Sequence, residues 1–167
     1  MPNVTTRAAR EHPAPLRLHE TTVAPEWVDY NDHLSEWAYL LVFGDAADAF
    51  FRYVGVDEAY RAAGHSLYTA ETHLHHLREA RLGERLLLTL QLLGTDAKRL
   101  HIVHEMFNTG GDRLAVGEQM LLHVDTRAGS VTPFPADLAA RLRQIAAAHA
   151  ALPVPDYVGH VMRIPGR

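Results

Sequence analysis

The pattern of hydrophobic and polar positions divides the chain into one long helix and a series of strands. Residues 16–23 alternate well enough for a strand. Over residues 34–54 the hydrophobic positions recur with helical spacing in two adjacent stripes, and only a narrow face with Asp45, Asp48 and Arg52 is strongly polar. A helix that is apolar around most of its girth must be covered, and we expect a sheet to cover it. Gly55 ends this helix, and a short second helix is predicted over residues 57–63.

Four further strand-like runs follow, over residues 67–77, 84–93, 99–107 and 114–124. The connections between them contain turn residues and are short enough for consecutive strands to pair as antiparallel neighbours. Residues 136–150 are predicted to form an Ala/Leu/Arg-rich helix, which an irregular Pro-rich tail follows. The pattern therefore predicts an α+β domain over residues 16–135, with a flexible arm before it (1–15) and a helix and tail after it (136–167). One sheet covers only part of so apolar a helix, so a homodimer or homotetramer is expected.

Composition narrows the classes of function. The 167 residues are 47% hydrophobic and 22% charged, as in soluble globular proteins. The formal net charge of −4 and the lack of a dense basic cluster argue against nucleic-acid binding. The absence of cysteine excludes disulfides, thiol nucleophiles and zinc–thiolate sites. We see no signal peptide and no stretch that would span a membrane, so we expect a cytoplasmic protein.

The polar junction over residues 28–33 is the most informative segment of the chain. Asp29, Asn31 and His33 place a carboxylate, an amide and an imidazole where the long helix is predicted to begin. Unpaired backbone N–H groups at a helix N-terminus favour negative charge, so a developing oxyanion could be held there beside a base. The spacing fits other roles equally: Asp29 or Asp32 as the helix N-cap, Asn31 as a turn residue, and His33 as a structural histidine.

With Tyr39 and Phe43 downstream, residues 28–34 resemble the Asp-x-x-Gly-His signature of acyl-CoA thioesterases of the 4-hydroxybenzoyl-CoA-thioesterase-like family. Residues 71–84 and 116–126 are similar to that family's later strand patterns. Residues 25–31, 42–46 and 71–73 are most like a carnitine-catabolism subgroup that hydrolyses betainyl-CoA. The resemblance implies a hotdog fold, an acyl-CoA substrate, and no metal or redox cofactor. Alternatives are a thioesterase for another short or aromatic acyl-CoA, and a non-catalytic hotdog module that binds acyl-CoA.

The resemblance also implies roles for residues of the junction. Asp29 is the expected base or nucleophile, and the amides that follow His33 would polarise the thioester carbonyl. Asn31 would orient water or donate to the thioester oxygen, and His33 would orient Asp29. The family usually has Gly where this chain has Asp32. If Gly is needed there for a left-handed turn, Asp32 can keep the turn, and we expect it to cap the helix while Asp29 reacts. If Gly is needed so that the thioester can approach the backbone closely, Asp32 would crowd the substrate.

Substrate binding is assigned to a second set of residues. Glu71 is expected to share a strand face with Thr69, His73 and His75, and it could balance the trimethylammonium charge of a betainyl group. Aromatic residues could form a cage worth about 0.5–2 kcal/mol per cation–π contact, or could simply pack in the core or an interface. The cage candidates are Trp27, Tyr30, Trp37 and Tyr68.

Three other sets of residues carry weaker expectations. The histidines around His73, His75 and His76 lack a metal-binding motif, so no metal site is predicted. Glu118 falls on an otherwise apolar strand face, and a bulge at Gly117 would move it out. The phosphates of CoA need basic partners, and the candidates at strand ends are Arg78, Arg81, Lys98 and Arg99.

Overall fold

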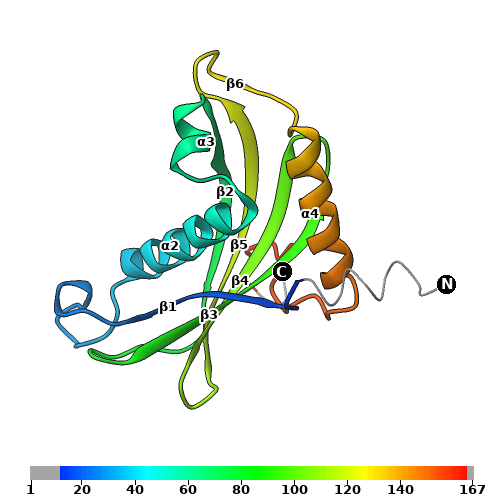
Figure 1. Ribbon diagram of the computed structural model, residues 1–167. Helices are drawn as coiled ribbons and strands as arrows, with labels where there is room; N and C mark the ends of the chain where they lie inside the picture. Colours follow the sequence, from blue (N-terminus) through cyan, green and yellow to red (C-terminus); the bar gives the residue numbers. More distant parts are fainter. Residues whose placement is uncertain (1–11, 165–167) are drawn as a thin grey trace.

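The computed structural model describes residues 12–164, in which a curled antiparallel sheet wraps one long helix (Figure 1). This is the α+β architecture expected from the sequence. The helices are α2 (Glu36–Val54), α3 (Glu58–Ala62) and α4 (Ala136–His149), with a short 3-10 turn at Pro25–Trp27. The strands are β1 (Leu16–Thr22), β2 (His65–His76), β3 (Arg85–Thr95), β4 (Arg99–Asn108), β5 (Arg113–Asp125) and β6 (Ser130–Val131).

The strand order corrects the expectation that every consecutive pair of strands would be neighbours. The order is β1-β3-β4-β5-β2, with β6 beside the end of β5. Strand β2 pairs with β5, from His65 opposite Asp125 to His76 opposite Ala115, and leaves β3 to pair with β1. The connection over residues 77–84 is therefore a crossing rather than a hairpin. Its backbone bonds to the segment after β1, where the Leu34 amide donates to Ala80 (2.8 Å) and the Gly83 amide to Val23 (3.0 Å).

Helix α2 contributes to two separate core clusters along its length. Its C-terminal half places Phe50 and Val54 in a cluster that α4 closes with Leu142 and Ile145. Its N-terminal half contributes Phe43 to a second cluster, which also contains Ala38, Val42, Leu86, Leu88 and Met106. Within the described chain, a stripe at the start of α2 remains exposed: Trp37 is 55% exposed, and Leu40 and Leu41 are also open. The predicted pair of Asp48 with Arg52 is confirmed on the polar face.

Two expectations about strand faces are wrong. A bulge between Thr69 and Glu71 puts Thr69 opposite Leu121 on the face that meets α2, whereas Glu71 lies opposite Met120 on the outer face. Conversely, the pairing of β5 is regular through Gly117, so Glu118 stays on the outer face. Gly117 instead makes room for the helix, because a Cβ atom there would lie 3.0 Å from the ring of Phe43.

The chain after α4 folds back across the outer face of the sheet. Gly159 donates its amide to Glu118 (2.9 Å), and the Glu118 carboxylate also contacts Nε2 of His101 (2.6 Å). The ring of His75 lies 4.8 Å from that of Tyr157 and 5.3 Å from that of His160. Gly159 of this segment and His101 of β4 together satisfy Glu118, which therefore does not need to leave the sheet.

Candidate functional site

A pocket of about 470 Å³ opens where α2 begins. The loop between β1 and α2 forms one wall, and the crossing connection after β2 forms the other. His33 and Arg81 make an isolated antiparallel bridge between the two walls. The lining residues are Asp29, Asn31, His33, Leu34, Glu36, Tyr39, His76, Leu77, Arg78 and Glu79. The structure therefore brings the three predicted catalytic residues to one cavity.

The Asp29 carboxylate is held by the backbone of its own loop. Its Oδ1 accepts the amide of Asn31 at 2.8 Å and lies 3.4 Å from the amide of His33. The Asp29 amide donates to the carbonyl of His33 (2.9 Å), and the Asp32 amide donates to the carbonyl of Asp29 (3.0 Å). Among the described residues, none bonds Oδ2, so one carboxylate oxygen is left to act at the pocket.

Asp32 adopts the left-handed conformation, with φ of +58°, so the tolerance of Asp for the position usually held by Gly is confirmed. The expectation that Asp29 or Asp32 caps the helix is wrong. The N-cap of α2 is Ser35, and it makes no side-chain cap bond. Within residues 12–164, the amides of Glu36 and Trp37 have no acceptor, and Glu36 lines the pocket. The first turn of the helix thus has open N–H groups, and its first residue lines the same pocket as Asp29.

The second wall contains residues whose roles the sequence did not predict. Glu79 places Oε2 3.2 Å from Nε2 of His33. The Tyr39 hydroxyl donates to the carbonyl of Arg78 and accepts the amide of Ala80, both at 3.3 Å. The ring of His76 packs edge-on against Tyr39 with centroids 4.7 Å apart. Burial raises the pKa of Tyr39, so the phenol stays protonated and can donate. Only Tyr39 had a signal in the sequence, as part of the family signature.

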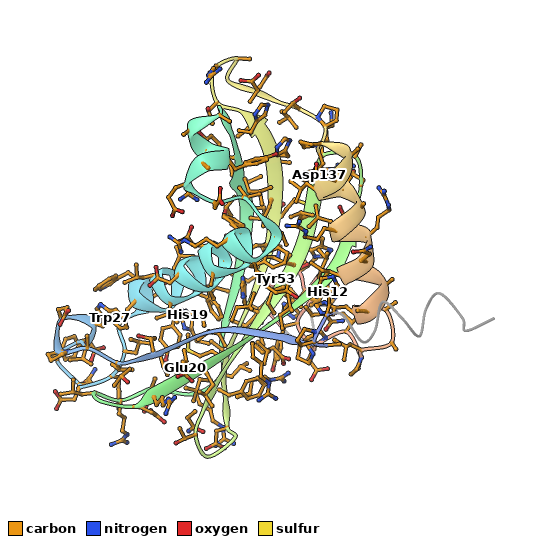
Figure 2. The ribbon with its side chains drawn as sticks, viewed as in Figure 1. His12, His19, Glu20, Trp27, Tyr53 and Asp137 are labelled. Carbon is orange, nitrogen blue, oxygen red and sulfur yellow. The ribbon has the colours of Figure 1, made fainter. Side chains whose placement is uncertain are left out.

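The predicted substrate-binding residues are not brought to this pocket. Glu71 binds Nε2 of His73 (2.8 Å) and lines a small hollow on the outer face of the sheet, and Tyr68 is exposed beside it on β2. Trp27, labelled in Figure 2, packs against the cluster around Phe43, whereas Tyr30 is 95% exposed on the loop.

The basic candidates for CoA also separate. Arg78 lines the pocket and pairs with Asp112 (3.3 Å), and Arg81 borders an adjacent hollow. Lys98 and Arg99 instead lie at the turn between β3 and β4, where both of their amides bond Asp96. Within the described part of the chain, no group of three His, Cys, Asp or Glu side chains is arranged to hold a metal ion.

Comparison with known sequences gives a consistent set of relatives. Residues 23–142 match the family model described as the thioesterase-like superfamily. The chain is 49% identical over 152 residues to the betainyl-CoA thioesterase of Pseudomonas aeruginosa, covering 90% of this chain and 96% of that protein. It is 51% identical over 146 residues to the L-carnitine dehydrogenase/betainyl-CoA thioesterase of Rhizobium meliloti, covering 87% of this chain. It spans only 29% of the length of that second relative.

Solved structures agree with the fold. A thioesterase from Pseudomonas putida superposes with a TM-score of 0.80 at 35% identity, covering 92% of this chain and 99% of that one. A hypothetical protein from Staphylococcus aureus, solved in complex with CoA, gives a TM-score of 0.85 at 24% identity over the same shares of the two chains. These likenesses confirm the predicted hotdog fold. None of the described helices is long and apolar enough to cross a membrane.

Proposed function

Because the chain belongs to the thioesterase-like superfamily, we propose that it is an acyl-CoA thioesterase whose substrate is betainyl-CoA. The observation that carries the proposal is that Asp29 and Glu36, the first residue of α2, line one pocket at the end of the helix where backbone amides are open. A regulator that only binds acyl-CoA would need the amides but not the carboxylate beside them. The relatives named betainyl-CoA thioesterase support the acyl group.

The proposed reaction uses both features. The free oxygen of Asp29 takes a proton from water, and the water oxygen attacks the thioester carbonyl carbon. The amides of Glu36 and Trp37 stabilise the oxyanion that forms, and the C–S bond then breaks to release the CoA thiolate, which is protonated. Asn31 and His33 shape the loop through their amides, and their side chains line the pocket beside the reacting atoms.

Asp29 could also attack the carbonyl directly and form an anhydride, which water then cleaves. Single turnover in ¹⁸O-labelled water detects the anhydride route when water cleaves the anhydride at Asp29. Direct attack by water puts the label in the released acid, whereas cleavage of the anhydride at the Asp29 carbonyl puts the label in the enzyme carboxylate.

Charge supports a cationic acyl group. Three carboxylates, on Asp29, Glu36 and Glu79, line the pocket, and Arg78, which also lines it, is paired with Asp112. A trimethylammonium group is favoured in such surroundings over a neutral group of the same shape.

The test compares thiol release from betainyl-CoA with release from 3,3-dimethylbutanoyl-CoA, in which carbon replaces nitrogen. We expect kcat/KM to favour the cation by about ten- to hundredfold, or roughly 1.4–3 kcal/mol. Equal rates would contradict the cationic specificity but leave the thioesterase. Binding of both esters without thiol release would instead identify a non-catalytic acyl-CoA module. Preference for an aromatic or another short acyl-CoA from a wider panel would identify the alternative substrates.

We further propose that the protein is a homodimer formed through the open edge of β2 and the exposed stripe of Trp37, Leu40 and Leu41. An unpaired strand edge and an exposed apolar surface are each typical of an interface between copies. The roles suggested for Glu71, Trp27, Tyr30 and Tyr68 in substrate binding stay predictions, as does a cytoplasmic location. Sedimentation of the wild type and of Leu41→Asp tests the dimer. We expect the wild type to sediment at the mass of a dimer and the variant at the mass of a monomer. A wild type at the mass of a monomer would contradict the proposal.

A further inference from the structure

We propose that Tyr39 is a positioning residue, whose hydroxyl holds the second wall of the pocket in register with the Asp29 loop. The proposal rests on the proposed function for its effect on catalysis. It rests on geometry alone for the contact itself. Tyr39 lies on α2 with its ring in the core cluster around Phe43 and its hydroxyl at the pocket.

The hydroxyl bonds both polar groups that flank Glu79. It donates to the carbonyl of Arg78 and accepts the amide of Ala80, each at 3.3 Å. Tyr39 and Ala80 are 4% and 0% exposed, so water does not readily replace these bonds. One oxygen atom on the helix therefore fixes the backbone on both sides of Glu79.

Two routes lead from this fixed segment to the Asp29 loop. The carbonyl of Ala80 accepts the amide of Leu34 (2.8 Å), which anchors the end of the loop. The Glu79 carboxylate lies 3.2 Å from Nε2 of His33. The backbone of His33 in turn bonds Asp29, because its carbonyl accepts the Asp29 amide (2.9 Å) and its amide points to the Asp29 carboxylate (3.4 Å).

These contacts separate the role of the hydroxyl from that of the ring. Phenylalanine at position 39 would fill the same core volume, and it would remove only the oxygen that bridges residues 78 and 80. The amide of Ala80 would then lack a partner in a buried position, and the segment carrying Glu79 would shift to find one. The shift would reach the site through His33 and Leu34.

Tyr39→Phe tests the proposal, with Tyr53→Phe as its matched control. Tyr53 lies on the same helix, and its hydroxyl bonds Nδ1 of His12 (2.7 Å), away from the pocket (Figure 2). We expect Tyr39→Phe to lower kcat for thiol release by about ten- to hundredfold with KM nearly unchanged, since small displacements of reacting groups have effects of that order. Tyr53→Phe should leave both constants close to those of the wild type.

A second measurement separates positioning from loss of folded protein. We expect the ring ¹⁵N signals of His33 to move in Tyr39→Phe and to stay in place in Tyr53→Phe, with circular dichroism showing both variants folded at the assay temperature. An unfolded fraction would lower the apparent kcat but would not move the His33 signals of the folded molecules. Unmoved His33 signals, or equal kcat in the two variants, would overturn the proposal. If the wild type releases no thiol from any acyl-CoA, the proposed function fails, while the His33 signals still decide whether Tyr39 positions the loop.

Discussion

The two halves of helix α2 do different work. The C-terminal half, around Phe50, is enclosed by strands and by α4, and its cluster consists of apolar side chains. The N-terminal half, around Phe43, is bordered at its start by the polar loop before α2 and by the crossing connection. The pocket opens between these two segments. One continuous helix therefore joins a closed apolar core to a pocket with polar lining that opens to solvent. The stability of the fold should depend mainly on the C-terminal half, and the chemistry on the N-terminal half.

Asp29→Asn should cause the largest loss of turnover of the variants of the N-terminal half. The amide keeps an oxygen for the bonds to Asn31 and His33 but cannot act as base, so we expect turnover to fall by about 10²- to 10⁴-fold with little change in melting temperature. Asp32→Asn is the matched control, because Asn also tolerates the left-handed conformation of that position. Thiol release and thermal denaturation measure the two effects. Turnover by Asp29→Asn at the level of Asp32→Asn would remove Asp29 from the mechanism.

Phe50→Ala should have the opposite profile. Phe50 is fully buried in the C-terminal cluster, and its truncation should lower the free energy of unfolding by about 3–5 kcal/mol. Phe50→Leu, which keeps most of the volume, should cost less than about 1.5 kcal/mol. Urea denaturation gives both values. Turnover per folded molecule should be retained, and a selective loss of kcat in Phe50→Ala would mean that the two halves are coupled.

His104 gives the N-terminal half a dependence on pH. Its ring packs by Phe43, is fully buried with neither nitrogen bonded, and burial lowers its pKa to about 4, with Gln119 partly opposing the effect. The unfolded chain takes up this proton near pH 6.5, whereas the folded protein does so only near pH 4. Stability from this group is therefore present above pH 6.5 and is lost as pH falls towards 4, by about 3 kcal/mol in total.

Urea denaturation of the wild type and His104→Leu between pH 7 and pH 4 isolates that contribution. The free energy of unfolding should fall more steeply for the wild type, because leucine has no proton to take up. Parallel curves would contradict a lowered pKa, because they would mean that the folded and unfolded chains bind the proton of His104 over the same pH range.

Gly117→Ala should have the smallest effect and should act on the same half. The added methyl group would meet the ring of Phe43, and we expect a loss of about 1–3 kcal/mol from crowding. Gly44→Ala is the control, since Gly44 lies on α2 with open space around it, and alanine there should stabilise the helix by about 0.5–1 kcal/mol. Equal changes in the melting temperatures of the two variants would show that the ring of Phe43 moves aside without a loss of stability.

The sequence predicted what local periodicity determines. The long helix, five strands and α4 appear within a few residues of their predicted bounds. Asp29, Asn31 and His33 could be placed together because only five residues of chain contain them. The left-handed turn at Asp32 followed from the residue type and the family pattern.

The features that were missed depend on distant pairing or on single irregularities. Strand β2 lies beside β5 rather than β3 in the curled sheet. The length of the connection between β2 and β3 does not predict this choice, because it allows either partner. The bulge between Thr69 and Glu71 reverses the face of every residue on one side of it, and the alternation of side chains hides such a change. Glu79 and His76 line the pocket from more than forty residues beyond the loop of Asp29 to His33. Those contacts exist only once the crossing connection has folded over the helix.

The C-terminal segment limits how copies of this protein could stack. Residues 152–160 already cover part of the outer face of the sheet, where Gly159 bonds Glu118 and Tyr157 and His160 pack against the ring of His75. A second molecule that approached this part of the sheet would have to displace residues 152–160 before it contacted the strands. A back-to-back contact between copies over this part of the sheet would therefore have to pack on the segment or displace it, whereas the dimer proposed through β2 and α2 would not.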